Sequence, residues 1–118
     1  MDTYEVIFHP DYAPEFRALG NEVKEALGEV FDLLRETGPE LGRPNVDTLH
    51  GSKHANMKEI RVLNTWRVAF AFDPERRAIV VCGGDKSGVN QARFYRELIR
   101  KADSRYDQWL SGDDAADR

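Results

Sequence analysis

The strongest constraint on the fold is the short turn that separates two apolar-rich segments, MKEIRVL (57–63) and WRVAFAF (66–72). Because successive side chains of a strand point to opposite faces, the length of this turn decides which residues of the two strands share a face. A two-residue turn would set Arg61 against Val68 and would mix charge into an apolar face. Burial of a charge without a partner costs several kcal/mol, so we predict a three-residue turn at 63–65.

The three-residue turn sorts the two strands into an apolar face and a polar face. Such a turn places a residue in the left-handed region, and we expect this to be Asn64 or Thr65. The apolar face holds the pairs Val62–Trp66, Ile60–Val68 and Lys58–Phe70. The polar face holds the pairs Arg61–Arg67, Glu59–Ala69 and Met57–Ala71. Since alanines are small, we expect the polar face to keep open space and to face the solvent.

Before this hairpin, the sequence predicts one strand and two helices. The segment TYEVIFH alternates with a period of two, which is typical of a strand, and Pro10 ends it. A short helix is expected over residues 11–20. A second helix, capped by Asn21, has apolar residues at steps of three and four, and Gly38 ends it. Residues 40–56 show no period and many turn-forming residues, so we predict a loop.

After the hairpin, the sequence predicts a third adjacent strand and a long helix. The run AIVVCGG is apolar throughout, which indicates a strand buried on both faces. The helix begins near Asn90, and Arg93, Arg96 and Arg100 form a stripe beside its apolar residues. We expect one domain over residues 1–110, followed by a flexible acidic tail at 111–118.

The order of these elements is strand-helix-helix-strand-strand-strand-helix. It predicts an α+β domain in which a small antiparallel sheet carries its helices on one side.

The composition bounds the class of protein. Cys82 is the only cysteine, so it cannot form an internal disulfide, and the three histidines are scattered. We therefore expect a buried thiol, no metal site and no cofactor. No apolar run reaches about 18 residues, and the N-terminus lacks the pattern of a signal peptide. We expect a cytoplasmic protein that does not enter the membrane.

The net charge of −4 is unevenly distributed along the chain. Residues 1–57 carry 5 Lys and Arg against 11 Asp and Glu, whereas residues 58–103 carry 10 against 6. This asymmetry permits a local basic surface on an acidic protein, as an anion-binding or RNA-binding face requires. Chance scatter of charges would give the same totals.

The polar face of the hairpin is the first candidate for chemistry. Arg61 and Arg67 stand directly across from each other, with Glu59 one step along. Two guanidinium groups at such a distance repel each other unless an anion lies between them, and their planar forks suit phosphate oxygens. Alternatively, Glu59 bridges both arginines in a surface ion-pair cluster. The sequence leaves both interpretations open.

Three further polar residues have an ordinary and a functional interpretation. Lys86 follows the last strand in CGGDKSG, although the spacing of a P-loop is absent. Tyr95 is either a core tyrosine with a hydrated hydroxyl or a site residue. His54, in the predicted loop, is either solvated or functional. No serine or cysteine lies beside a fixed base, so covalent hydrolase chemistry has no support.

Together these motifs resemble the RelE/ParE toxin superfamily, and within it the HigB-like branch. The resemblance spans residues 3–110. It rests on the order and spacing of four segments: FHPDYAPEF, LHGSKHANMKEIRV, WRVAFAF and GGDKSGVNQARFYRELIRKA.

The resemblance implies a RelE-like fold and the toxin of a type II toxin–antitoxin system. Such a toxin is a ribosome-dependent mRNA endoribonuclease, which directs the RNA 2′-hydroxyl onto the adjacent phosphate by metal-free acid–base chemistry and charge stabilisation. The implied partners are mRNA, the ribosome and a helix-turn-helix antitoxin, with which the toxin forms a hetero-oligomer. The alternative is a protein that cuts no RNA: a ParE-like gyrase inhibitor or a degenerate antitoxin-binding module.

The resemblance also implies roles for particular residues. Arg67 matches the phosphate-stabilising arginine of the family, and Arg61 matches a strand arginine on the same face. Lys86 matches a basic residue after the last strand, Tyr95 a catalytic tyrosine and Glu59 a candidate base. The residues expected to bind RNA are Lys58, His54, Arg93 and Arg96.

Overall fold

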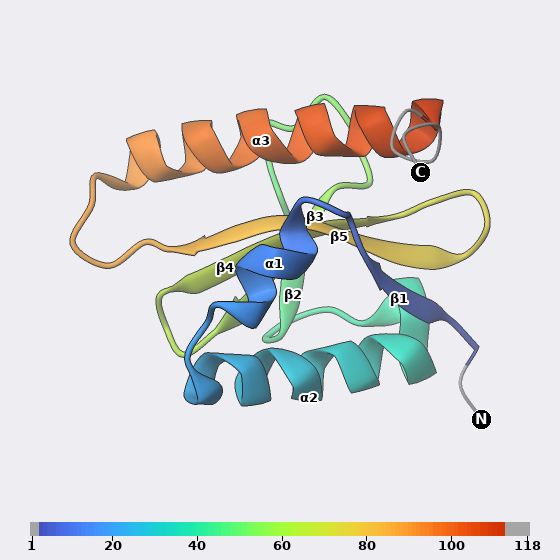
Figure 1. Cartoon of the computed structure of the whole chain (residues 1–118), viewed down its shortest axis with the longest axis horizontal. Coiled ribbons are helices and arrows are strands. Elements are labelled where there is room, and N and C mark those ends of the chain that lie inside the picture. The colour runs from blue at the N-terminus through green and yellow to red at the C-terminus, as the bar shows by residue number, and fades with distance from the viewer. Residues whose placement is uncertain (1–2, 113–118) are drawn as a thin grey trace.

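The computed structural model describes residues 3–112 as a five-stranded sheet with helices on both faces (Figure 1). The strands follow the order β1-β5-β4-β3-β2 across the sheet. The elements in chain order are β1 (Glu5–Phe8), α1 (Tyr12–Arg17), α2 (Asn21–Thr37), the 3-10 turn η1 (Gly38–Glu40), β2 (Val46–Thr48), β3 (Lys58–Val62), β4 (Trp66–Phe72), β5 (Arg77–Asp85) and α3 (Gln91–Ser111). The predicted α+β class is confirmed.

The predicted register of the hairpin is also confirmed. β3 and β4 pair antiparallel, with Arg61 opposite Arg67 and Ile60 opposite Val68. Asn64 (φ 65°) is left-handed, which confirms the expectation that Asn64 or Thr65 is, and Leu63 (φ 51°) is left-handed as well. The polar and apolar faces therefore fall on the sides of the sheet where the sequence placed them.

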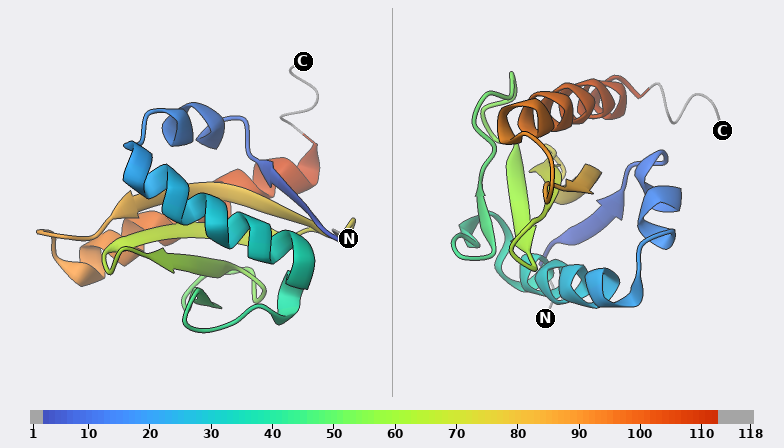
Figure 2. Two further views of the ribbon diagram at one scale, coloured as in Figure 1. Left: turned by 90° about the horizontal axis from the view of Figure 1, so that it is seen from below. Right: turned by 90° about the vertical axis from the view of Figure 1, so that its left-hand side faces the viewer.

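The prediction that all helices lie on one side of the sheet is wrong. α1 and α2 cover one face, whereas α3 covers the other, so the sheet is the middle layer (Figure 2). The physical reason is that β4 and β5 carry apolar residues on both faces, and each face needs a cover. The first face packs Ile60, Val68, Phe70 and Val80 against α2, and the second packs Ala69, Ala71, Ile79 and Val81 against α3.

The open space expected over Ala69 and Ala71 is filled. Both residues are fully buried beneath Leu98, Ala102 and Tyr106 of α3. Small side chains let a helix approach the sheet closely, so the alanines accommodate α3 instead of leaving a cavity. Cys82 is fully buried, as predicted, and burial in the same layer raises the pKa of its thiol to about 12.

The sheet is mixed, which corrects the prediction of an antiparallel sheet. β1 pairs in parallel with β5, while the other three pairs are antiparallel. β2 lies within residues 40–56, where a loop was expected, and pairs with β3. A strand of three residues is too short to show a period of two, and the direction of β1 depends on the helices that follow it. Neither feature can be read from local hydrophobicity.

The ends of the helices differ slightly from the predicted ones. Asn90 caps α3 as expected, since its side chain accepts a hydrogen bond from the Arg93 amide at 2.9 Å. Asn21 is the first residue of α2, and the residue that caps this helix is Gly20. α3 continues through Ser111, and residues 113–118 of the predicted tail lie outside the described residues. Within residues 3–112, no helix combines the length and the apolar character that a bilayer span requires.

A buried carboxylate joins the β4–β5 turn to the C-terminal end of α3. Asp73 accepts hydrogen bonds from the Arg77 guanidinium (2.7 and 2.9 Å), from the backbone amides of Glu75 and Arg77 (both 3.0 Å) and from the Trp109 indole (3.1 Å). The Arg77 guanidinium also lies 5.3 Å from the Trp109 ring centroid. Burial alone would raise the pKa of Asp73, but these hydrogen bonds outweigh it and lower the pKa.

We expect Asp73→Asn to lower the free energy of unfolding at pH 7 by about 1–3 kcal/mol, because charged hydrogen bonds to Arg77 and Trp109 are lost. A carboxyl whose folded pKa is depressed stabilises the fold above its unfolded pKa, about 4, and loses that contribution as the pH falls through the folded value. The wild-type protein should therefore lose stability between pH 5 and pH 3 more steeply than Asp73→Asn. Urea unfolding at both pH values tests this, and parallel pH dependences would contradict it.

Candidate active site

The centre of the candidate site is a chain of three side chains from three elements. The Tyr95 hydroxyl on α3 donates to Glu59 Oε1 on β3 at 2.8 Å and accepts from Arg67 Nε on β4 at 3.1 Å. Arg67 Nε lies 3.8 Å from the same carboxylate oxygen. Arg67 is 4% exposed and Glu59 is 8% exposed, so the expectation that this part of the polar face is open to solvent is wrong.

The arrangement follows from the hairpin register and from the position of α3. Glu59 pairs with Ala69, and Arg67 lies two residues before Ala69 on the same face. α3 crosses this face, and Tyr95 projects from its second turn between the two charged groups. The tyrosine is therefore both a packed residue and part of the polar chain, so the two interpretations of Tyr95 are not exclusive.

Burial raises the pKa of the Tyr95 hydroxyl, and its hydrogen bond to Glu59 adds to this effect. The hydroxyl therefore keeps its proton at neutral pH. The hydroxyl donates this proton in a hydrogen bond to the Glu59 carboxylate. Its oxygen is therefore free to accept a hydrogen bond from Arg67. Tyr95 thus holds the buried carboxylate of Glu59 and the buried guanidinium of Arg67 in one fixed geometry.

Arg67 is held along one edge of its guanidinium and lies beside a groove. Its Nη1 donates to the Trp66 carbonyl at 2.9 Å, in addition to the bond from Nε to Tyr95. Within residues 3–112, Nη2 has no hydrogen-bond partner. Arg67 is one of the residues that line an open groove of about 430 Å³, together with Arg43, Arg61 and the β3–β4 turn. We call it the arginine groove. Neither Glu59 nor Tyr95 lines it.

A carboxylate that the sequence did not single out balances the two outer arginines. Asp47 Oδ2 lies 2.8 Å from Arg43 Nη2 and 3.9 Å from Arg61 Nη1. The hydrogen bond from the Thr48 amide, and then that from Arg43, lower the pKa of Asp47. The arginines are therefore in ion pairs, but Glu59 does not bridge both of them. Glu59 pairs with Arg67, and Arg61 pairs with Asp47.

Sequence reasoning missed Arg43 and Asp47 because they lie in the segment expected to be a loop. Their spacing of four residues was visible, but only the pairing of β2 with β3 sets Asp47 opposite Glu59 and beside Arg61.

The structure brings one further predicted residue to this end of the sheet and moves two others away. The Lys86 amide bonds to the Thr65 carbonyl at 2.9 Å, and its ammonium lies 3.4 Å from Gln91. Lys58 lies on the opposite face, opposite Phe70. His54 lies 2.8 Å from Asp107 of α3. Asp107 follows Tyr95 by twelve residues, which corresponds to about 18 Å along the helix axis.

The two remaining candidates, Arg93 and Arg96, are exposed on α3, and Arg93 lies 4.0 Å from Glu97. Among residues 3–112, no three His, Cys, Asp or Glu side chains are placed to hold a metal ion.

Comparison with known proteins agrees with the fold. Residues 14–107 match the family described as "Phage derived protein Gp49-like". The chain belongs to this family. It is 43% identical over 109 residues to HigB3, a candidate toxin of Mycobacterium tuberculosis. The alignment covers 92% of this chain and 95% of HigB3. It is 40% identical over 97 residues to HigB2, a second candidate toxin of that organism. This alignment covers 79% of this chain and 48% of HigB2.

The fold is similar to that of the Escherichia coli toxin RelE, solved as an arginine-to-alanine double mutant in the free state. The TM-score is 0.60 at 21% identity, and the match covers 86% of this chain and 97% of the RelE chain. The predicted RelE-like fold is confirmed, and so is the resemblance to the HigB-like toxins of the RelE/ParE superfamily.

We expect Arg67→Ala to lower the free energy of unfolding of this HigB-like protein by about 3 kcal/mol, because it leaves Glu59 buried without its charge partner. Arg61→Ala is the matched control. Its side chain is 39% exposed, so its loss should cost less than about 1 kcal/mol. Urea denaturation of both variants measures the difference. Equal, small effects would show that Arg67 is not integrated into the packed layer.

Proposed function

We propose that this HigB-like chain is the toxin of a toxin–antitoxin pair and that it cleaves mRNA on the ribosome without a metal ion. One observation carries the proposal: Arg67, whose guanidinium is buried and fixed, lines a groove together with two further arginines. Three arginines around one opening suit the phosphate backbone of RNA.

In the proposed reaction, the RNA 2′-hydroxyl gives its proton to water as its oxygen attacks the adjacent phosphorus. The bond from phosphorus to the 5′-oxygen breaks, and the 5′-oxygen takes a proton from water and leaves as a hydroxyl, so that a 2′,3′-cyclic phosphate remains. Negative charge grows on the phosphate oxygens as the 2′-oxygen bonds to phosphorus. Arg67 would meet that charge with a donor that Tyr95 and the Trp66 carbonyl already hold in place, so little reorganisation is needed during the reaction. We therefore assign Glu59 and Tyr95 to positioning Arg67, since neither lines the groove.

The outer arginines, Arg43 and Arg61, would bind the RNA phosphate, whereas Arg67 would stabilise the charge that grows on it during the reaction. Arg43 and Arg61 are exposed and share Asp47, and such an exposed ion pair is worth only about 0–1 kcal/mol. An RNA phosphate can therefore take the place of Asp47 at small cost. The excess of positive charge in residues 58–103 supports the docking of an otherwise acidic protein onto RNA.

We expect induced expression of the wild-type protein to arrest growth and to create new transcript 5′ ends within translated regions. Arg61→Ala should lower cleavage about 10²-fold, at the low end of the range for loss of one charge-stabilising donor. The matched control is Arg35→Ala on α2, whose side chain is 36% exposed and also pairs with an aspartate. It should cleave as the wild type does.

Mapping transcript ends after induction decides among the outcomes. Growth arrest with intact transcripts and broken chromosomal DNA would favour a gyrase-inhibiting toxin and contradict the proposal. Normal growth at confirmed soluble expression would exclude a toxin of either kind. Equal cleavage by Arg61→Ala and the wild type would remove the arginine groove from the reaction.

Arg67→Lys separates charge from geometry at the central position. Lysine keeps the positive charge but lacks the planar fork, so it cannot bind Tyr95, the Trp66 carbonyl and a phosphate at once. We expect folded Arg67→Lys to cleave at an intermediate rate, above Arg67→Ala and below the wild type, in a purified translation assay. A wild-type rate for Arg67→Lys would show that charge alone suffices.

A further inference from the structure

The second half of β5 has a free edge. β1 pairs with the first four residues of β5 and then leaves the sheet, so Cys82–Asp85 pair with β4 alone among the described strands, and Val81 lies at a register shift without a partner in β4. The Val81 carbonyl accepts a hydrogen bond from Arg105 at 2.8 Å. Figure 1 shows β5 continuing well beyond the end of β1. An unpaired strand edge is a template for another strand.

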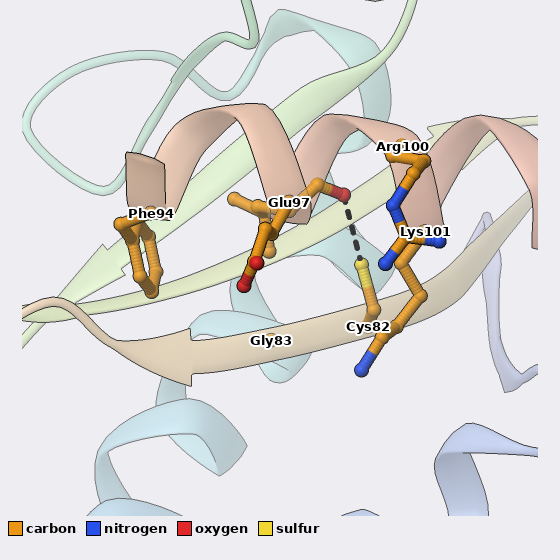
Figure 3. Close-up of a pocket in the computed structure, with 7 residues that line it drawn as sticks. Cys82, Gly83, Phe94, Glu97, Arg100 and Lys101 are labelled. Atoms are coloured by element: carbon orange, nitrogen blue, oxygen red, sulfur yellow. Dashed lines mark hydrogen bonds between the residues drawn. The ribbon is translucent and has the colours of Figure 1, made fainter. Parts of the chain in front are cut away.

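A groove runs between this edge and α3. Its deeper part, about 170 Å³, lies between Cys82 and Gly83 on one side and α3 on the other (Figure 3). A shallower part of about 460 Å³ continues past Asp85 to the start of α3, and the two parts share Phe94 and Glu97. We call the whole the β5–α3 groove.

The groove offers both apolar surface and main chain to a ligand. Phe94 is half-buried, and Val89, at the shallow end, is 54% exposed. A Cβ at Gly84 would lie 3.2 Å from the Phe94 ring, so the glycine lets this ring lie close to the strand. A ligand that lies along the edge could therefore pair with the backbone of β5 and place an apolar side chain against Phe94.

The charges of the groove select an acidic ligand. Its α3 wall carries Arg93, Arg100 and Lys101 against one carboxylate, Glu97, and β5 adds a second carboxylate, Asp85, so that the groove keeps an excess of positive charge. Within residues 3–112, neither Arg100 nor Lys101 takes part in an ion pair. Figure 3 shows the Lys101 side chain reaching down past Cys82 in front of β5. Two uncompensated cations beside a strand edge would attract carboxylates on an added strand.

We propose that the β5–α3 groove binds an extended, acidic segment of the partner antitoxin, which pairs with Val81–Asp85 as a sixth strand. The proposal rests on the proposed toxin–antitoxin function for the identity of the partner. A peptide fits better than RNA, because the groove presents a main-chain edge and its aromatic ring is half-buried rather than displayed for stacking. The groove lies at the β1 side of the sheet, whereas the arginine groove lies at the β3–β4 turn beside β2, so the two sites are distinct.

The test reverses the two uncompensated cations in the full chain. We expect Arg100→Glu/Lys101→Glu to remain folded and toxic, and to bind the antitoxin encoded beside it about 100-fold more weakly, so that co-expression no longer restores growth. The matched control, Lys24→Glu/Arg35→Glu, makes the same change of charge on α2, which covers the other face of the sheet. It should bind within about threefold of the wild type.

Hydrogen exchange of the wild-type complex tests the added strand directly. Amides of Val81–Asp85 should exchange more slowly when the antitoxin is bound, while those of the opposite edge strand, Val46–Thr48, should not change. This measurement stands even if the double variant fails to fold.

Two outcomes would overturn the inference: unchanged exchange at Val81–Asp85, or a charge-reversed variant that binds antitoxin normally but no longer cleaves mRNA, which would assign the groove to RNA. A wild-type protein that is not toxic, yet shows this protection with its antitoxin, would refute the proposed nuclease and leave the inference intact.

Discussion

A guanidinium that is almost fully buried is the constraint on which the site depends. Removing Arg67 from water is costly unless its hydrogen bonds are satisfied and a counter-charge lies close by. The sheet supplies Glu59 through the register of one hairpin, and α3 supplies the Tyr95 hydroxyl that joins the two. Arg67 is thereby fixed at the wall of the arginine groove. The cost of burial is the physical source of its fixed orientation.

Because Tyr95 belongs to α3, the geometry of the site depends on how that helix is docked. The far end of α3 is held by the Asp73–Trp109 bond, and its middle by Arg105, which binds Glu15 of α1 at 2.6 and 3.2 Å. The segment after β2 also reaches it, through the bond between His54 and Asp107. His54 was expected to bind RNA, but in the fold it supports the helix that carries Tyr95. Contacts far from the groove thus stabilise the position of Arg67.

The sequence predicted what depends on local pattern and missed what depends on pairing partners. The hairpin register followed from the cost of placing Arg61 on an apolar face, and it brought Arg61, Arg67 and Glu59 together correctly. The burial of Arg67 was missed, because an alternating strand does not show which faces a later helix will cover. Arg43 and Asp47 were missed for a related reason, since only the pairing of β2 with β3 brings them to the site.

The same distinction explains how one small sheet can offer two separate binding regions. In the arginine groove the charges are partly balanced within the fold, because Asp47 stands between Arg43 and Arg61 where the proposed phosphate would lie. In the β5–α3 groove the cations Arg100 and Lys101 form no ion pair within residues 3–112. A site with an internal counter-ion favours a ligand that can displace it, such as the dense charge of an RNA backbone. A site with unpaired cations beside a strand edge favours a ligand that brings both carboxylates and main-chain hydrogen bonds, as the proposed antitoxin segment would.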